Sequence, residues 1–343
     1  MNNRRIRFGI HWLLFISCMA FTAMPASAEM VAKLPQVMQP NYIAFTDQRV
    51  YVVEESAKIH IFGKSPQGVI FEKTFGQEGE GPGEFDFIHQ IRVCKDHLEI
   101  PTFGKFARFS LDGQFLDEIK LPMRVFKNAI YRIGENFLVK DWRFDNKETK
   151  TTINLYDKDF KLIRELGVHK EAGGASKINL VAEYYSPRAL GETIYLVESG
   201  KKTIVTIYDK FGVQQREIHL LLPPVKMTDA LKETIIKPLK EAPDMKSRWA
   251  AFAERLSFPG HAPGLDYFVV VDDRFVTRTY NYRGDRVEFV IFDMQGKELK
   301  RVFLPYTGRL NNGCLFCFFQ GRFYYLKENL DEEVWELHSE KVW

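Results

Sequence analysis

Two short stretches of the sequence place arginine beside aromatic side chains. They are residues 142–144 (Trp-Arg-Phe) and residues 280–283 (Tyr-Asn-Tyr-Arg). Arginine donates paired hydrogen bonds and aromatic rings offer flat stacking faces, so these stretches suit a carboxylate, a glycan or a peptide. Solvated hairpin tips with packed rings are the other interpretation. The candidate binding residues are Trp142, Arg143, Tyr282 and Arg283.

A second set of polar residues falls where six repeated strands are expected to begin. If those strands line a central channel, the set forms a partly polar ring. Its members are Asn41, His89, Asn128, Arg188, Asp266 and Asn312. Calcium prefers several oxygen ligands with negative charge among them, whereas this ring offers one carboxylate beside an arginine and a histidine. We therefore predict no cofactor, with calcium as the alternative.

Three cysteines follow the N-terminal segment, at positions 94, 314 and 317. Cys314 and Cys317 have the spacing of a redox or metal motif, but Phe318 stands where c-type haem attachment needs histidine. In a strand, positions three apart point to opposite faces, so packing is the favoured interpretation and a redox or metal role stays open. The sequence has no Gly-x-Ser-x-Gly or His-Glu-x-x-His motif.

The first 28 residues have the features of a secretory signal peptide. Three arginines precede an apolar run over residues 8–23, and residues 26–28 (Ala-Ser-Ala) form a small-x-small cleavage site. The run is short for a membrane span, so we expect none in the mature chain. A lipoprotein signal ending at Cys18 is less favoured, because Phe15 replaces the leucine of that motif. We expect an exported protein in the periplasm or at the cell surface of a bacterium.

The charge of the chain limits its partners. The 343 residues have a formal net charge of +3, and the three arginines of the signal-like segment account for it. Residues 29–343 are therefore balanced in charge and long enough for one large repeat domain. This balance argues against nucleic acid or an anionic membrane as the main partner.

A hairpin pattern recurs along the chain. In residues 289–302, alternating apolar residues flank Asp-x-x-Gly, which is typical of two antiparallel strands joined by a tight turn. The unit recurs, with changes at the turn, at residues 59–75, 107–119, 153–166 and 204–218. Two further short strands precede each hairpin, so each repeat supplies four antiparallel strands, as in a β-propeller blade.

The spacing of the repeats predicts six blades. The large apolar residues that mark the third strand of each repeat lie 45 to 52 residues apart, except for one interval of 84 residues. Only residues 339–343 follow the last strand, too few for another hairpin arm. We therefore predict an all-β, six-bladed β-propeller of four-stranded blades over residues 29–343. A strand near residues 31–34 would complete the last blade.

The long interval predicts a short helical insertion, residues 222–262, between blades 4 and 5. Thr228 and Asp229 can cap a first helix that carries Leu231, Ile235 and Leu239, with Pro238 and Pro243 limiting it. Asp244 can cap a second helix, with residues 245, 249, 252 and 256 on one apolar face. We expect these faces to pack on the propeller, with a lid or a partner-binding helix as the alternative.

Residues 75–119 resemble the NHL-type repeat of six-bladed propellers. The similarity rests on the Gly-Pro-Gly loop of residues 81–83, on residues 91–93 (Ile-Arg-Val) and on the turn at residues 110–113 (Ser-Leu-Asp-Gly). It is greatest to exported bacterial members of unassigned function and implies the same six-bladed ring. Lactonase-like six-bladed propellers hold calcium in the channel and use it to polarise an ester. Resemblance to these propellers would imply a different function, that of a calcium-dependent hydrolase or lyase.

These features together favour an exported, NHL-like binding or scaffold protein over an enzyme. It would recognise a protein, peptide or glycan through its rim loops, with Arg143 and Arg283 as anchors. The alternative is a calcium-dependent hydrolase or lyase with its site at the central channel. A cluster of carboxylates at the channel mouth would favour that alternative.

Overall fold

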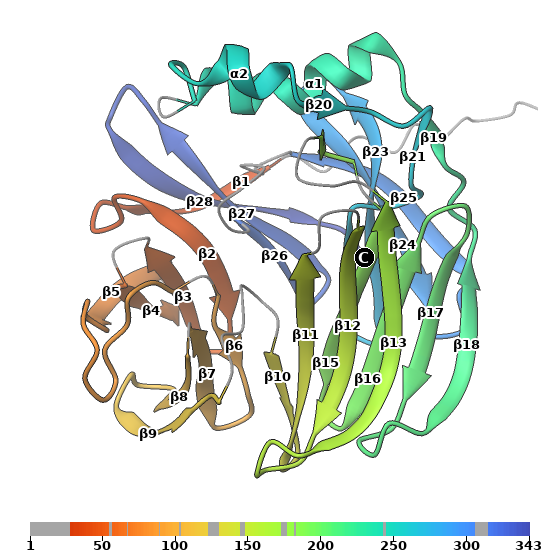
Figure 1. The fold of residues 1–343 in the computed structure, drawn as a ribbon. Coiled ribbons are helices and arrows are strands. Elements are labelled where there is room, and N and C mark those ends of the chain that lie inside the picture. Colours follow the sequence, from red (N-terminus) through yellow and green to blue (C-terminus); the bar gives the residue numbers. More distant parts are fainter. Residues whose placement is uncertain are drawn as a thin grey trace, which may run out of the picture.

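The computed structural model describes residues 28–54, 57–66, 68–88, 90–102, 104–122, 130–144, 148–172, 177–181, 183–242, 245–305 and 315–343. Within them, six four-stranded antiparallel sheets form the blades of a six-bladed β-propeller (Figure 1). The predicted fold class is confirmed. Around the centre, the innermost strands of neighbouring blades lie side by side, β2 beside β6 and β26, and β15 beside β10 and β22.

The first three blades follow the chain in order. The first consists of β2 (Pro40–Phe45), β3 (Arg49–Glu54), β4 (Ile59–Ser65) and β5 (Gly68–Phe75). The second consists of β6 (Arg92–Val93), β7 (His97–Thr102), β8 (Lys105–Ser110) and β9 (Phe115–Lys120). The third consists of β10 (Ile130–Ile133), β11 (Asn136–Phe144), β12 (Glu148–Tyr156) and β13 (Leu162–Ala172).

The last three blades include one that combines both ends of the propeller. The fourth consists of β15 (Tyr184–Leu190), β16 (Thr193–Ser199), β17 (Thr203–Tyr208) and β18 (Gln214–Leu220). The fifth consists of β22 (Tyr267–Val271), β23 (Arg274–Arg283), β24 (Arg286–Asp293) and β25 (Glu298–Pro305). The sixth consists of β26 (Phe316–Phe319), β27 (Arg322–Asn329), β28 (Val334–Lys341) and β1 (Glu29–Leu34).

The sixth blade closes the ring, as predicted from the sequence. β1 pairs antiparallel with β28, with Ala32 opposite Leu337. Nε1 of Trp335 donates a hydrogen bond to the carbonyl oxygen of Met38 at 3.1 Å. The carboxylate of Glu54, at the end of β3, accepts one from the backbone N–H of the same methionine. These contacts hold the segment that leads from the last blade into the first.

Aspartate side chains shape the tight hairpin turns. Oδ1 of Asp209 accepts hydrogen bonds from the backbone N–H groups two and four residues later, both at 2.9 Å. Gly212 then adopts a φ of 73°, in the left-handed region that favours glycine. Asp157 makes the equivalent two bonds in the third blade, where Phe160 takes this position with a φ of 57°. Its ring stacks on Phe137 with centroids 4.6 Å apart, and this packing compensates for the unfavourable backbone conformation.

Aromatic side chains fill the space between neighbouring blades. Phe289 of β24 contacts the rings of Phe316, Phe318 and Phe323 in the sixth blade, with centroids 5.3 to 5.6 Å apart. Each such pair contributes about 0.5–1.5 kcal/mol beyond the burial of apolar area. The repeated aromatic positions of the sequence therefore hold the blades to one another.

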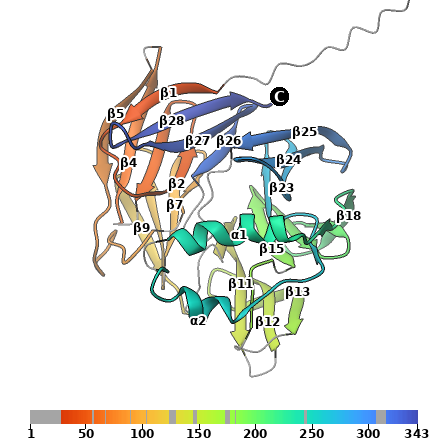
Figure 2. The same cartoon turned by 90° about the horizontal axis from the view of Figure 1, so that it is seen from above.

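The insertion connects β18 to β22 and lies over one face of the ring (Figures 1 and 2). Its elements are β19 (Val225–Lys226), α1 (Asp229–Glu241), α2 (Trp249–Ala253), β20 (Leu256–Ser257) and β21 (His261–Ala262). Thr228 caps α1 by accepting from the N–H of Leu231 at 3.2 Å. Leu231 and Ile235 pack against Val181 and Tyr280, so α1 rests on the propeller as expected.

The structure confirms the first predicted helix, whereas the second is shorter than predicted. α1 carries the predicted apolar residues Leu231, Ile235 and Leu239, continues past Pro238 and ends at Glu241, two residues before Pro243. Proline removes only one backbone donor here, and the burial of Leu239, which is 5% exposed, stabilises the last turn.

The second helix is much shorter than its apolar pattern predicts. It covers only α2, because Leu256 pairs instead, as part of β20, with Ile178 of β14 (Ile178–Asn179). The backbone N–H of Ile178 also donates to the carbonyl of Arg255 at 2.7 Å. Pro243 and Asp244 lie outside the described residues.

Candidate functional site

A cavity of about 610 Å³ lies at the centre of the propeller. Its walls come from the innermost strand of every blade, mainly from the carboxyl-terminal halves, for example residues 42–45 of β2 and 269–271 of β22. The insertion leads into the amino-terminal end of β22, and Figure 1 shows its helices above the ring, beyond that end of the innermost strands. The cavity and the insertion therefore occupy opposite faces of the ring.

The cavity walls carry more positive than negative charge. Among the described wall residues, the basic ones are Arg92, Lys95, Arg132 and Arg188, and the acidic one is Glu99. The guanidinium of Arg132 donates to the neutral carbonyl of its neighbour Gly134 at 3.1 Å, and Lys95 is exposed. Such a cavity attracts anionic groups, and arginine in particular suits carboxylates.

Arg188 connects three blades through hydrogen bonds. Its Nε donates to the carbonyl of Phe268 in the fifth blade at 3.0 Å. Its Nη atoms donate to the hydroxyl of Tyr131 in the third blade at 3.2 Å and to that of Tyr184 at 2.7 Å. Burial alone would lower the pKa of Arg188, but the surrounding tyrosine oxygens outweigh it and raise the pKa. The channel therefore holds a positive charge whose hydrogen-bond acceptors are neutral.

Arg92 places a second guanidinium beside the same tyrosine. Its Cζ lies 3.9 Å from the centroid of the Tyr131 ring, and it donates to the carbonyl of Ile130. Its Nη1 is 3.7 Å from Oε2 of Glu99. Burial lowers the pKa of Arg92, but a guanidinium remains protonated in proteins.

Half of the predicted channel ring lies in the described part of the chain. His89, Asn128 and Asn312 lie outside it. Arg188 was expected at the start of its strand but is the fifth residue of β15, because this strand begins at Tyr184. That position brings Arg188 to the cavity, whereas Asn41 does not line it and donates from Nδ2 to the carbonyl of Ile88 at 2.8 Å.

Asp266 is the ring's carboxylate, and it is already paired. Its two oxygens accept from Nε and Nη2 of Arg278 at 2.8 and 3.0 Å. Calcium needs several oxygen ligands whose negative charge is available to the ion. The described ring residues therefore do not fit a calcium ion, and no observation on them favours a calcium-dependent hydrolase or lyase.

The first predicted rim pair lies on the third blade. Nζ of Lys140 is 4.9 Å from the centroid of the Trp142 ring, which also packs partly between blades. The side chain of Arg143 is 78% exposed, and its Nε is 3.5 Å from Oδ2 of Asp141. Arg143 therefore presents most of its guanidinium to solvent.

The second rim pair lies on the fifth blade, beside the insertion. Tyr282 and Arg283 line a groove of about 490 Å³ between α1 and the hairpin of β23 and β24. The Arg283 guanidinium lies 4.0 Å from the centroid of the Phe303 ring. Trp142 and Arg143 do not line this groove, so the two predicted pairs are separate sites in the described structure.

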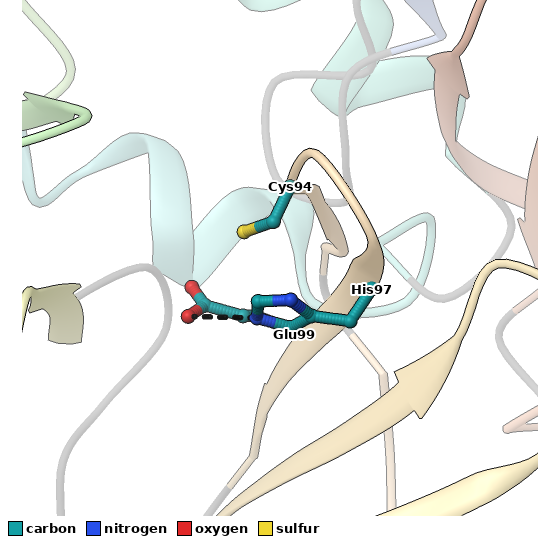
Figure 3. Close-up of side chains that lie close together, drawn as sticks. All are labelled: Cys94, His97 and Glu99. Atoms are coloured by element: carbon teal, nitrogen blue, oxygen red, sulfur yellow. Dashed lines mark ion pairs between the residues drawn. The ribbon is translucent and has the colours of Figure 1, made fainter.

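Three side chains of metal-binding types, which the sequence analysis did not single out, lie together beside the cavity (Figure 3). They are Cys94, His97 and Glu99, and their donor atoms lie within 4.8 Å of one another. Burial, with a smaller contribution from the Glu99 carboxylate, raises the pKa of the Cys94 thiol to about 12. The sequence could have predicted this cluster from its Cys-x-x-His-x-Glu spacing. Across a tight hairpin turn, this spacing places all three side chains on one face.

The cysteine pair that the sequence did single out is described only in part. Cys317 lies in β26, lines the cavity and packs against the apolar cluster between the sixth and first blades. Cys314 lies outside the described residues. A redox or metal role for this pair stays untested.

Comparison with known proteins agrees with the fold. Residues 35–218, more than half of the chain, match the family model DUF5128, described as a 6-bladed beta-propeller. The chain belongs to this family of six-bladed propellers. No curated protein sequence matches this family member.

Solved structures similar to this family member have low sequence identity to it. BamB from Moraxella catarrhalis is 11% identical, with 91% of this chain and 99% of that chain covered and a TM-score of 0.42. The Neurospora crassa Pan2 WD40 domain is 9% identical, with 91% and 95% covered and a TM-score of 0.44. The computationally designed Ika8 protein is 9% identical, with 90% and 98% covered and a TM-score of 0.44.

The helices of the described residues were also compared with the requirements of a membrane span. None of them is long and apolar enough to cross a bilayer.

Proposed function

We propose that this propeller is an exported binding or scaffold protein rather than an enzyme, acting in the periplasm or at the cell surface of a bacterium. The signal-like residues 1–28 support export. The NHL-like repeat of residues 75–119 supports a scaffold role. Because propellers also host enzymes, the fold alone does not decide the function, and the proposal depends on the chemistry of the cavity.

The partner in this proposal carries carboxylate groups. The observation that supports this is the excess of positive charge in the central cavity, where Arg92, Lys95, Arg132 and Arg188 outnumber Glu99. Since residues 29–343 are balanced in charge, this attraction is local to the cavity and not a property of the whole surface. Acidic peptides and glycans that contain uronic acids both present the required carboxylates.

Binding of defined probes tests this proposal. We would measure fluorescence anisotropy with labelled hexaglutamate, hexaglutamine and oligogalacturonate. Lys95→Ala/Arg132→Ala removes two positive charges from the cavity, and we expect at least about tenfold weaker binding of an acidic probe, since charged hydrogen bonds contribute roughly 1.5–3 kcal/mol.

The matched control is Lys201→Ala/Lys202→Ala. These exposed lysines lie in the turn between β16 and β17, on the insertion face, so their removal changes the net charge equally but not the cavity. Equal weakening by both double variants, or no preference for acidic probes, rejects the cavity as the binding site.

The groove beside the insertion supports a second binding surface, in the rim loops. Arg283 is held over Phe303 and lines the groove together with Tyr282, which suits a planar or carboxylate-bearing group of a protein, peptide or glycan. We propose Arg283 as the anchor there, with Trp142 and Arg143 as a separate rim site. Arg283→Ala and Arg143→Ala in the same binding assay distinguish the two sites. If neither affects binding while the cavity variant does, the rim proposal fails and the cavity proposal stands.

A further inference from the structure

The hairpin between β6 and β7 brings together three potential metal ligands. The backbone N–H of Cys94 donates to the carbonyl of His97 at 2.9 Å, so these residues face each other across a two-residue turn. Glu99 follows two positions later and lies on the same face of β7. Sγ of Cys94, the imidazole of His97 and the carboxylate of Glu99 thus lie within 4.8 Å of one another (Figure 3).

The histidine is oriented as a metal ligand would be. Nδ1 of His97 is 2.6 Å from Oδ1 of Asp96, and because a carboxylate only accepts, this nitrogen carries a proton. In the neutral ring, Nε2 then has a lone pair, and this atom is buried with no hydrogen-bond partner among the described residues. A carboxylate on the other ring nitrogen is the usual arrangement around metal-bound histidine.

The carboxylate beside it is buried between the histidine and an arginine. Glu99 is 5% exposed. Its nearest charged or titratable neighbours are Nε2 of His97 at 3.6 Å and Nη1 of Arg92 at 3.7 Å. A buried carboxylate facing a lone pair is unfavourable unless a proton or a metal ion lies between them. The sulfur of Cys94 as a third donor favours the metal ion.

We propose that Cys94, His97 and Glu99 bind a zinc ion. Sulfur, imidazole nitrogen and carboxylate oxygen together match the ligand preferences of zinc and not those of calcium or magnesium. Zinc at 2.0–2.3 Å from its ligands needs donors about 3.3–3.8 Å apart, a range that the His97–Glu99 pair already meets at 3.6 Å. Three protein ligands leave a fourth position, and Cys94 and Glu99 place it beside the cavity, where water or a ligand carboxylate can occupy it.

Cobalt(II) is the probe that tests this site, because a cobalt–thiolate bond gives an intense near-ultraviolet charge-transfer band. We expect one equivalent of Co²⁺ to produce this band in the purified protein and Zn²⁺ to abolish it by displacement. Cys94→Ser should not produce the band. The matched control, Cys317→Ser, alters the other described cysteine of the cavity and should retain it, with thermal melting to confirm that both variants fold.

Two further measurements keep the proposal open to rejection. Asp96→Asn should weaken zinc binding about tenfold or more without removing a ligand, since loss of such an outer carboxylate typically costs 10–100-fold in affinity. No band in the wild-type protein, a band retained by Cys94→Ser, or a band lost in Cys317→Ser overturns the assignment. None of these experiments uses a binding partner, so their outcome is independent of the proposed carboxylate ligand.

Discussion

The charged side chains on the two faces of the ring have different partners. On the insertion face, Asp266 forms a two-bonded pair with Arg278, and Glu54 lies 3.3 Å from His60. On the cavity face, Arg132 has a neutral carbonyl as its described hydrogen-bond acceptor. Charged groups of the insertion face thus form ion pairs that stabilise the fold, whereas the hydrogen bonds of Arg132 and Arg188 on the cavity face go to neutral acceptors.

This difference indicates where a ligand would bind. A fold of this size normally pairs its buried charges, because an unpaired one costs several kcal/mol. Groups left without such compensation are therefore good candidates for function. On this argument, the cavity with Arg132 and Arg188, whose hydrogen-bond acceptors are neutral, is a better candidate than the predicted ring position Asp266, which is fully engaged in an ion pair.

The largest effect is expected from breaking a pair on the insertion face. Arg278→Ala leaves Asp266, whose side chain is 16% exposed, without its partner, and loss of one member of a buried pair costs about 3 kcal/mol or more. Urea unfolding measures this loss. The double variant Asp266→Asn/Arg278→Ala leaves no unpaired charge and should regain much of it. Equal loss in the single and double variants would show that the pair is not the cause.

The second prediction concerns Glu54 and acid stability. Burial alone would raise the pKa of Glu54, but His60 and the backbone N–H groups of Met38 and Gln39 lower it from 4.5 to about 2. A carboxyl with a lowered pKa stabilises the fold above its ordinary pKa, and this stabilisation is lost as pH falls through about 2. We expect Glu54→Gln to lower the free energy of unfolding by about 2 kcal/mol at pH 7.

The pH dependence provides the control for this prediction. The difference between wild type and Glu54→Gln in urea midpoint should shrink steadily from pH 5 to pH 2, because protonation removes the same charge that the substitution removes. A difference that stays constant over this range would mean that the substitution acts through packing and not through the charge of Glu54.

Most of the fold could be predicted from local sequence signals. The Asp-x-x-Gly turns specify hairpins because aspartate caps two backbone N–H groups and glycine accepts a positive φ, as at Asp209 and Gly212. The closing strand followed from the few residues left after β28. The second helix of the insertion was less predictable, since the end of α2 depends on pairing between Leu256 and Ile178.

The cavity was harder to predict because its charges are brought together by the ring and not by the sequence. Arg92, Arg132 and Arg188 lie 40 or more residues apart and meet because the innermost strands converge. The predicted ring residues were expected at the opposite end of those strands, and Arg188 reaches the cavity because its strand begins four residues earlier than expected. The Cys94–His97 hairpin could be predicted from its spacing, although the position of Glu99 between His97 and Arg92 depends on tertiary packing.

The last prediction has the smallest expected effect and tests the comparison of the two faces most directly. It replaces an arginine by alanine on the cavity face, as Arg278→Ala does on the insertion face. Arg132→Ala removes a half-buried guanidinium from a cavity that also holds Arg92 and Arg188. Loss of one hydrogen bond to Gly134 is offset by less repulsion among like charges, so the free energy of unfolding should change by less than about 0.5 kcal/mol. Urea unfolding of this variant beside Arg278→Ala measures the contrast directly. If Arg132→Ala destabilises the protein as much as Arg278→Ala, the cavity arginines are structural, and the distinction between a stabilising face and a binding face is wrong.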